Sequence, residues 1–360
     1  MRDGKLHIFQ FAHNAVCARP RLEIPAKHLT PSGQFEFTTF RRLDTNTCTR
    51  IITSADMLIL QYLPYSPGLG KLMHLLNQTG RPVIFEIDDD LLDLEPDSPY
   101  LEVAPKGYPE RLRQTLLRAQ AVQCSTRALA ESLAAYHREV AVLENQLDEM
   151  PVFRAPAIQD RAIVVGYAAG ENHGTDWVVA REAFNRCLAE AAAAGREVQV
   201  CIIGDRAIYD SIESRHKHFL PVLGYSDYLQ VLGCFDISLM PLANTRFNRA
   251  KSDLKFLESA ACSCAVIGSD IAYSRCIKHG ESGLLFHTPT EFAECLRSLL
   301  REPEQIPRLA RAAYTYVKEN RLMGQHIHKW QATYLNWYRR RKELIAASIK
   351  KRTQTCADKR

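Results

Sequence analysis

Short apolar, β-rich runs alternate with helical stretches of about ten residues, and this alternation limits the folds open to the chain. The expected strands of the first half are Leu6–Phe11, Phe35–Phe40, Met57–Tyr62, Pro82–Ile87, Ala121–Cys124 and Val140–Leu143; the expected helices are Arg19–Leu29, Leu69–Gln78, Pro109–Gln120 and Thr126–Tyr136. Strands separated by helices of this length predict βαβ units and a parallel sheet.

A second series of the same kind follows the segment Asp148–Asp160, which has two prolines and no sustained period and is therefore expected to be a linker. The second-half strands are predicted at Ala162–Tyr167, Val198–Ile203, Ile237–Met240 and Leu284–Phe286, and a long helix at Thr175–Ala194. A chain of 360 residues is long enough for two such domains. Ligands of doubly wound sheets bind at the carboxyl ends of the strands.

Composition points to a protein of a reducing compartment. Eleven scattered cysteines without CxxC or Cys/His spacing support neither a zinc site nor a disulfide framework. No apolar run suits a signal peptide or a membrane span, so we expect a cytoplasmic protein with no nucleic-acid partner. The run from Arg339 to Arg360 has nine basic residues against two acidic ones; it can lie on anionic lipid at the inner membrane face or stay solvated.

The stretch Phe247–Ile267 is expected to form a helix followed by a strand. Lys251, Lys255 and Glu258 would then share one helix face, with Leu254, Leu257 and Ala261 on another. The amides of residues 250–252, the Ser252 hydroxyl and the Lys251 charge would suit a diphosphate at the helix start. The alternative is that Ser252 only caps the helix and both lysines are solvated.

Glu258 is the sharper candidate in this stretch, because it sits among small and apolar residues. A carboxylate accepts hydrogen bonds from two neighbouring hydroxyls, as on a ribose. Burial without a partner would be costly, which favours a ligand contact over a solvated side chain.

The same stretch resembles the donor-binding region of GT-B glycosyltransferases of the retaining family 4 (group 1). Glu258 fits the second glutamate of the family's Glu-x7-Glu pattern, and GESGLLF at 280–286 resembles the turn and strand that follow it. VVGYAAGENHGTDW at 164–177 resembles the first strand and glycine loop of the nucleotide-sugar domain, with His173 and Asp176 matching a subgroup. VIFEIDDDLLD at 83–93 and VQCSTRALAESL at 122–133 resemble the N-terminal domain.

This resemblance implies two facing Rossmann-like, doubly wound domains with a cleft between them. Their expected bounds are 1–149 for the acceptor side, 150–324 for the nucleotide-sugar side, and 325–360 for a helix that packs back and a basic tail. It implies catalytic roles for Glu258 and Lys251, and donor contacts from Gly170, His173, Asn248, Ser252 and Lys255. A retaining, metal-independent transfer without a cofactor is implied, with a glycan, lipid or protein as acceptor.

The sequence departs from the family pattern at the first glutamate, where Ala250 stands eight residues before Glu258. The usual Arg and Lys after the first strand are replaced by Gly170-Glu-Asn-His173, so Lys251 and His173 would have to supply part of their chemistry. Two other functions therefore stay open: a nucleotide-sugar epimerase of similar architecture, and an inactive relative that binds a sugar nucleotide or a glycan.

Asp88–Asp90 follows a buried strand and contains a DxD pattern. In metal-dependent GT-A enzymes such carboxylates hold a divalent cation and a diphosphate. Here they lie far in sequence from the phosphate residues, so Asp88 and Asp89 are expected on the acceptor side of the cleft or as helix caps.

Overall fold

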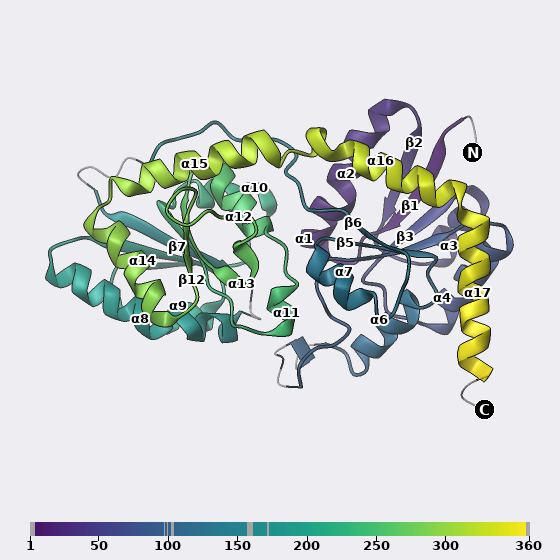
Figure 1. Cartoon of the computed structure of the whole chain (residues 1–360), viewed down its shortest axis with the longest axis horizontal. Helices are drawn as coiled ribbons and strands as arrows, with labels where there is room; N and C mark the ends of the chain where they lie inside the picture. The colour runs from purple at the N-terminus through teal and green to yellow at the C-terminus, as the bar shows by residue number, and fades with distance from the viewer. Residues whose placement is uncertain are drawn as a thin grey trace. The chain divides into compact units, whose positions relative to one another are not determined.

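The computed structural model describes residues 4–96, 98, 100–101, 104–156, 161–170 and 173–357. They form two compact units (Figure 1). Unit 1 comprises Met1–Asp148, Ala250–Ser252 and Met323–Arg360, and unit 2 comprises Glu149–Arg249 and Asp253–Leu322. Residues 157–160 of the expected linker lie outside the described residues, and 149–156 have no regular structure.

Unit 1 has a six-stranded parallel sheet of order β2-β1-β3-β4-β5-β6. Its strands are β1 (Leu6–Phe11), β2 (Phe35–Phe40), β3 (Met57–Gln61), β4 (Val83–Ile87), β5 (Ala121–Cys124) and β6 (Val140–Val142). Its helical elements are α1 (Ala15–Ala18), η1 (Arg19–Glu23), α2 (Ile24–Leu29), η2 (Thr30–Ser32), α3 (Thr45–Ser54), α4 (Pro67–Gln78), α6 (Tyr108–Leu116), α7 (Arg127–Leu133), α16 (Met323–Arg339) and α17 (Arg341–Ala357). This is a doubly wound order with the first strand between the second and third.

Successive side chains of the unit 1 strands point to opposite faces of the sheet, so apolar side chains are buried on both faces. Ile8, Ile59 and Ile84 pack on one face with η1, α2 and α16. Their sequence neighbours on the other face pack with α3 and α4, and further along the sheet with α6 and α7. All six strands expected from the sequence are confirmed, whereas helix α3, which is rich in threonine, was not expected.

Unit 2 has the order β12-β11-β10-β7-β8-β9, also fully parallel. Its strands are β7 (Ile163–Ala169), β8 (Val198–Gly204), β9 (Lys217–Leu220), β10 (Ile237–Met240), β11 (Ala265–Ser269) and β12 (Leu284–Phe286). Its helices are α8 (Gly174–Ala193), α9 (Arg206–Asp210), α10 (Tyr225–Leu232), α11 (Arg246–Arg249), α12 (Leu254–Ala261), α13 (Asp270–Tyr273), α14 (Pro289–Arg301) and α15 (Gln305–Asn320). Numbered from β7, this is the 3-2-1-4-5-6 order of dinucleotide-binding folds.

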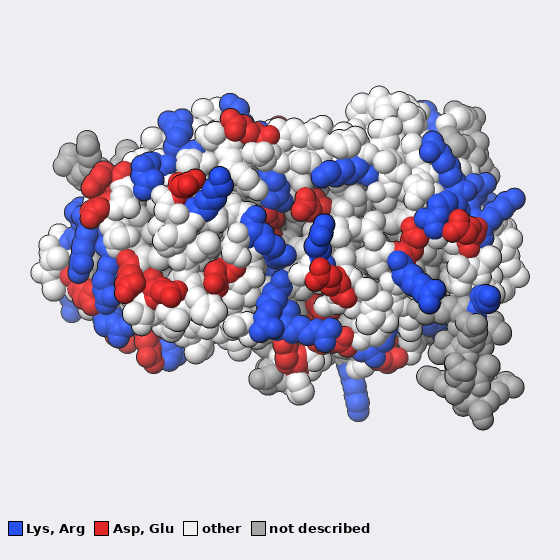
Figure 2. All heavy atoms as spheres, viewed as in Figure 1, with Lys and Arg blue, Asp and Glu red and all other residues white. Residues whose placement is uncertain are grey.

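Helices cover both faces of the unit 2 sheet (Figure 1). α8 and α14 pack on one face around Phe184 and Phe292, and α10 with Cys262 and Cys264 packs on the other. Over the face of unit 2 seen in Figure 2, Lys and Arg are interspersed with Asp and Glu. This mixture on that face suits locally built binding sites better than a broad surface for a polyanion.

The C-terminal basic run is not a solvated tail along its described part. It forms α17, which packs on unit 1 through Leu344 and Ile345 and through a hydrogen bond of 3.0 Å from Gln120 Nε2 to Ser348 Oγ. Leu344 and Ile345 are buried, whereas Ile349 is 48% exposed, so only part of the apolar surface of α17 packs on unit 1. Among the described residues no helix is both long and apolar enough to cross a bilayer.

A fully buried ion pair fastens the core of unit 1. Arg21 of η1 donates from Nε to Glu86 Oε1 of β4 over 2.7 Å, and from Nη2 to Oε2 over 3.3 Å. Its Nη1 also donates to the Leu143 carbonyl and, over 3.0 Å, to Asn145 Oδ1, while its guanidinium lies 5.3 Å from the Trp330 ring centre. Burial raises the pKa of Glu86 to about 7, so the carboxylate depends on Arg21 to keep its charge.

We predict that Glu86→Met lowers the free energy of unfolding by about 3–5 kcal/mol, because Arg21 is left as a buried charge without its carboxylate. The double variant Arg21→Met/Glu86→Met buries no unpaired charge, so its free energy of unfolding is expected to fall less than that of Glu86→Met. Urea unfolding followed by tryptophan fluorescence measures both. Glu131→Met, at an exposed position, is the control; a double variant as unstable as the sum of the single losses would contradict the prediction.

Candidate functional site

The candidate site lies at the carboxyl ends of β7 and β10 in unit 2. These neighbouring strands are the first and fourth of the sheet, so the strand order reverses between them. Ligands of doubly wound sheets bind at such a switch point. Gly204 at the end of β8 has φ of 97°, and a Cβ there would lie 2.1 Å from the Ala169 carbonyl oxygen. The close approach of the two strand ends therefore requires glycine.

Asp176 ties the two loops together. It lies in the first turn of α8 and is only 3% exposed. Its Oδ1 accepts from the Ala243 amide over 2.9 Å and from Asn248 Nδ2 over 2.6 Å, and its Oδ2 lies 2.7 Å from His173 Nδ1. A single carboxylate thus holds the loop after β7 against the loop after β10.

Lys255 of α12 completes the chain of contacts. Its ammonium donates to the Ala168 carbonyl over 3.0 Å and lies 3.3 Å from His173 Nε2. Since an ammonium can only donate, Nε2 accepts and the proton of a neutral His173 is on Nδ1, where it donates to Asp176. The Lys255 charge is held at the end of β7 by this arrangement.

Glu258 lies one turn further along α12 and is 6% exposed. Tyr228 of α10 donates its hydroxyl to Glu258 Oε2 over 3.1 Å. Burial, and then the neighbouring Glu258 carboxylate, raise the pKa of Tyr228 well above its usual value, so the phenol stays a donor. The expected burial of Glu258 is confirmed, and one oxygen is oriented by a protein group.

The expected helix through Lys251, Lys255 and Glu258 is wrong at its first turn. α11 ends at Arg249 and α12 begins at Leu254, so Lys251 shares no helix face with the other two. The amides of residues 250–252 consequently do not form the N-terminus of α12. No side chain caps α12, and Ser252 is not its cap.

Of the four residues between α11 and α12, Ala250–Ser252 belong to unit 1 and Asp253 belongs to unit 2. Ala250 is buried in the apolar cluster of Phe85 and Val122, and its carbonyl accepts from Thr126 Oγ1 over 2.8 Å. Lys251 Nζ lies 3.9 Å from Asp89 Oδ1, and Ser252 Oγ accepts from Asn145 Nδ2 over 3.0 Å. The structure therefore brings Asn248, Lys255, Glu258 and His173 into unit 2 and places Lys251 and Ser252 elsewhere.

Gly170 follows β7 directly, and its carbonyl accepts from the His173 amide over 3.1 Å. Glu171 and Asn172 of the same loop lie outside the described residues. Asp176 makes the hydrogen bonds that hold the two loops of the site together. In the sequence it was indicated only by its spacing from His173. Tyr228, some thirty positions before Glu258, gave no signal in the sequence.

In unit 1, Asp88 and Asp89 form a turn after β4 around the Tyr62 hydroxyl. This hydroxyl accepts from the amides of Asp88 over 3.0 Å and Asp89 over 2.7 Å, and donates to the Asp88 carboxylate. Burial raises the pKa of the Asp88 carboxyl group. The Tyr62 backbone has a φ of 49°, which is uncommon for a bulky residue. Asp88 is thus engaged in the turn, whereas Asp89 is the more exposed of the two.

Within the parts of the chain that the structure describes, no three His, Cys, Asp or Glu side chains are arranged to hold a metal ion.

Comparisons with known proteins bear on unit 2 and on the fold. Residues 159–302 match the family model described as "Glycosyl transferases group 1". No curated protein sequence matches the chain.

Solved structures of similar fold include HepE from Anabaena with UDP and glucose (TM-score 0.62, 14% identity, 92% of this chain and 99% of that one). Two further structures are similar. One is sucrose-phosphate synthase from Thermosynechococcus elongatus (TM-score 0.62, 12% identity, 93% of this chain and 99% of that one). The other is a glycosyltransferase from Rickettsia africae (TM-score 0.62, 14% identity, 95% of this chain and 99% of that one). TarM is similar over 77% of this chain, which spans 54% of TarM. At these identities the likeness establishes the GT-B fold.

We predict that Asp176→Ala destabilises the protein by at least about 1–3 kcal/mol, since buried donors of Ala243, Asn248 and His173 lose their acceptor. Thermal or urea unfolding measures the loss. Asp227→Ala, on the exposed side of α10, is the matched control and should stay within about 0.5 kcal/mol of the wild type. Equal stabilities of the two variants would show that Asp176 does not hold the loops.

Proposed function

Starting from a group 1 glycosyltransferase domain at residues 159–302, we propose that the protein transfers a sugar from a nucleotide-diphosphate sugar to an acceptor hydroxyl. The observation that carries this proposal is the contact between Lys255 and His173 at the switch point of unit 2. Lys255 lies on α12, the helix that also contains the buried Glu258. Phosphates and nucleotides bind at this place in doubly wound folds.

In the proposed donor site, Glu258 accepts hydrogen bonds from the two ribose hydroxyls. Tyr228 already donates to its Oε2, which fixes the carboxylate for that task. Lys255 and the backbone at Gly170 receive the diphosphate, His173 holds the Lys255 ammonium in place, and Asn248 positions the loop through Asp176. Lys251 and Ser252 are not assigned to the diphosphate, because they contact Asp89 and Asn145 of unit 1.

The proposed reaction breaks the bond between the anomeric carbon and the diphosphate oxygen and forms a bond from that carbon to the acceptor oxygen. The acceptor proton goes to the departing diphosphate. Negative charge grows on the leaving group, and the fixed ammonium of Lys255 stabilises it. We propose retention of configuration, as the family resemblance implies. We propose that the reaction needs neither a metal nor a cofactor, since side chains supply the positive charge that the diphosphate requires.

The acceptor is proposed to bind unit 1 near Asp89, whose amide donates to the Tyr62 hydroxyl and whose carboxylate lies 3.9 Å from Lys251 Nζ. A cytoplasmic location is likewise proposed, with the exposed Lys342 and Lys350 of α17 as side chains suited to an anionic membrane surface.

One observation favours a second function, nucleotide-sugar binding without turnover. Ala250 stands where the family resemblance implies a glutamate, and it is packed among apolar residues of unit 1. Measurable donor binding together with no hydrolysis and no transfer would favour this function.

We predict that UDP-glucose or GDP-mannose binds the wild type and that Glu258→Ala weakens this binding at least about tenfold, the equivalent of about 1.4 kcal/mol. UDP-glucose is the first donor to test, since a structure of similar fold holds it. Tyr228→Phe is the matched control: it removes the internal hydrogen bond but keeps the carboxylate, so binding should weaken far less. Calorimetric titration that finds no binding to the wild type, or equal binding by Glu258→Ala, would defeat the site.

We predict that Lys255→Met lowers the rate of donor hydrolysis or transfer by about 10²-fold or more with a smaller effect on donor binding, because the ammonium acts mainly on the developing charge. Release of UDP or GDP measures the rate. EDTA should leave the wild-type rate unchanged. Loss of activity in EDTA and its recovery with manganese would contradict metal-independent transfer.

A further inference from the structure

A polar cavity lies in unit 1, and none of the residues assigned to the donor lines it. Its volume is about 220 Å³. It is lined by Arg127 at the start of α7, by the end of β6 and the loop that follows it, and by one side of α16; the lining residues are Arg127, Val142, Leu143, Glu144, Gln146, His326, Lys329 and Trp330. We call it the α16 pocket. It lies at the carboxyl ends of β5 and β6, where ligands of such sheets bind.

The walls of the α16 pocket are fixed by the core. Arg21 holds the Leu143 carbonyl and the Asn145 side chain, and the Leu147 carbonyl accepts from the Met323 amide over 2.8 Å. Trp330 is 1% exposed and lies against Arg21, which fixes α16. The loop and the helix that carry the polar side chains are therefore preorganised, which lowers the entropic cost of binding.

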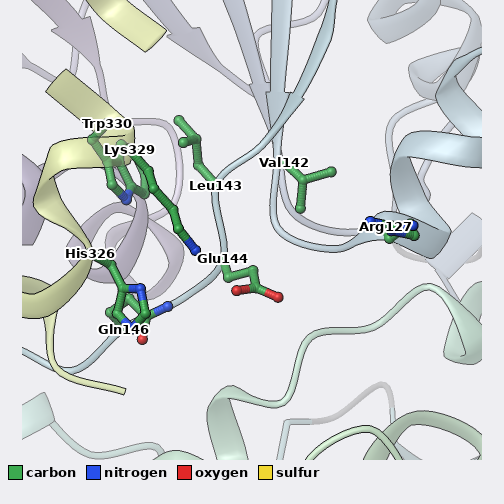
Figure 3. A pocket seen from close by; sticks show the side chains of 8 residues that line it. All are labelled: Arg127, Val142, Leu143, Glu144, Gln146, His326, Lys329 and Trp330. Carbon is green, nitrogen blue, oxygen red and sulfur yellow. The ribbon is translucent and has the colours of Figure 1, made fainter. Parts of the chain in front are cut away.

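The polar side chains of the α16 pocket have room to meet a ligand. Lys329, Arg127 and Glu144 are exposed, and among the described residues none of the three forms a hydrogen bond or ion pair. Figure 3 shows the Lys329 ammonium and the His326 ring on the same side as Glu144 and Gln146, with Arg127 across the strand end. The Lys329 ammonium thus lies on the same side of the pocket as Glu144, and Arg127 adds a second permanent positive charge to the lining.

We propose that the α16 pocket binds a saccharide unit that carries an anionic group, either a carboxylate or a phosphate. The cations attract and hold the anionic group, since Arg and Lys are the residues that pair with carboxylate and phosphate. The exposed Glu144 carboxylate accepts hydrogen bonds from sugar hydroxyls, which a simple anion lacks. The pocket is smaller than those of drug-sized ligands, which suits a single sugar unit.

This inference rests on the proposed function, because it names an anionic sugar as the acceptor class of a glycosyltransferase. The binding step itself needs neither a donor nor turnover. It can therefore be tested on the full chain with small probes alone.

Titration calorimetry or ligand-observed NMR with glucuronate, glucose 6-phosphate, glucose and inorganic phosphate tests the proposal. Glucuronate or glucose 6-phosphate should bind at least about tenfold tighter than both glucose and inorganic phosphate, and the better of the two identifies the anionic group. Lys329→Met and Arg127→Met should each weaken that probe about tenfold, as expected for a lost charged hydrogen bond. Both positions are exposed, so folding should be unaffected.

Lys342→Met, at an exposed position on α17, is the matched control and should bind the probe like the wild type. Glu144→Gln should reduce the difference in binding affinity between glucose 6-phosphate and inorganic phosphate. Equal binding by Lys329→Met and Lys342→Met, inorganic phosphate binding as tightly as the sugar phosphate, or no binding of either anionic sugar would overturn the proposal.

Glu258→Ala separates the two proposals. It should lose donor binding and keep the probe affinity of the wild type, because Glu258 does not line the α16 pocket. If the wild type binds the probe but no donor, the proposed function fails alone. If donors bind and no anionic sugar does, the α16 pocket inference fails alone.

Discussion

The carboxylate of Asp176 decides the geometry of unit 2, because two loops at the carboxyl edge of the sheet meet on it. One oxygen serves the loop after β10 through Ala243 and Asn248, and the other serves the loop after β7 through His173. His173 in turn faces Lys255 of α12. One buried acceptor thus joins the loop after β7 to the loop after β10, and through His173 it also positions the Lys255 ammonium of α12.

Unit 1 is organised by a different device, the buried pair of Arg21 and Glu86. A charge pair out of water is maintained only where further hydrogen bonds satisfy it, and here the Leu143 carbonyl and Asn145 do so. The same contacts fix the loop after β6. Asn145 reaches Ser252, so the segment 250–252 is also part of this network.

The two buried carboxylates explain why the units present different chemistry at equivalent edges of their sheets. In unit 2 the network ends in a lysine and a glutamate, a combination that suits a diphosphate and a ribose. In unit 1 the fixed loop carries Glu144 and Gln146 opposite Lys329, a combination of charge and hydrogen-bonding groups that suits an anionic sugar. The proposed donor and acceptor chemistries therefore rest on different residues and can be tested separately.

The sequence by itself determined the βα alternation and all six strands of unit 1, because hydrophobic periodicity is a local property of the chain. The small and apolar neighbours of Glu258 also indicated that this carboxylate is buried. The sequence also singled out Lys255 and His173, through helical spacing and family resemblance. It could not show that the helix predicted through Lys251 is broken at 250–253, since helical periodicity continues across the break while packing of Ala250 in unit 1 ends the helix. The contacts of Asp176, of Tyr228 with Glu258 and of α17 with unit 1 join residues far apart in the chain, and only the tertiary structure decided them.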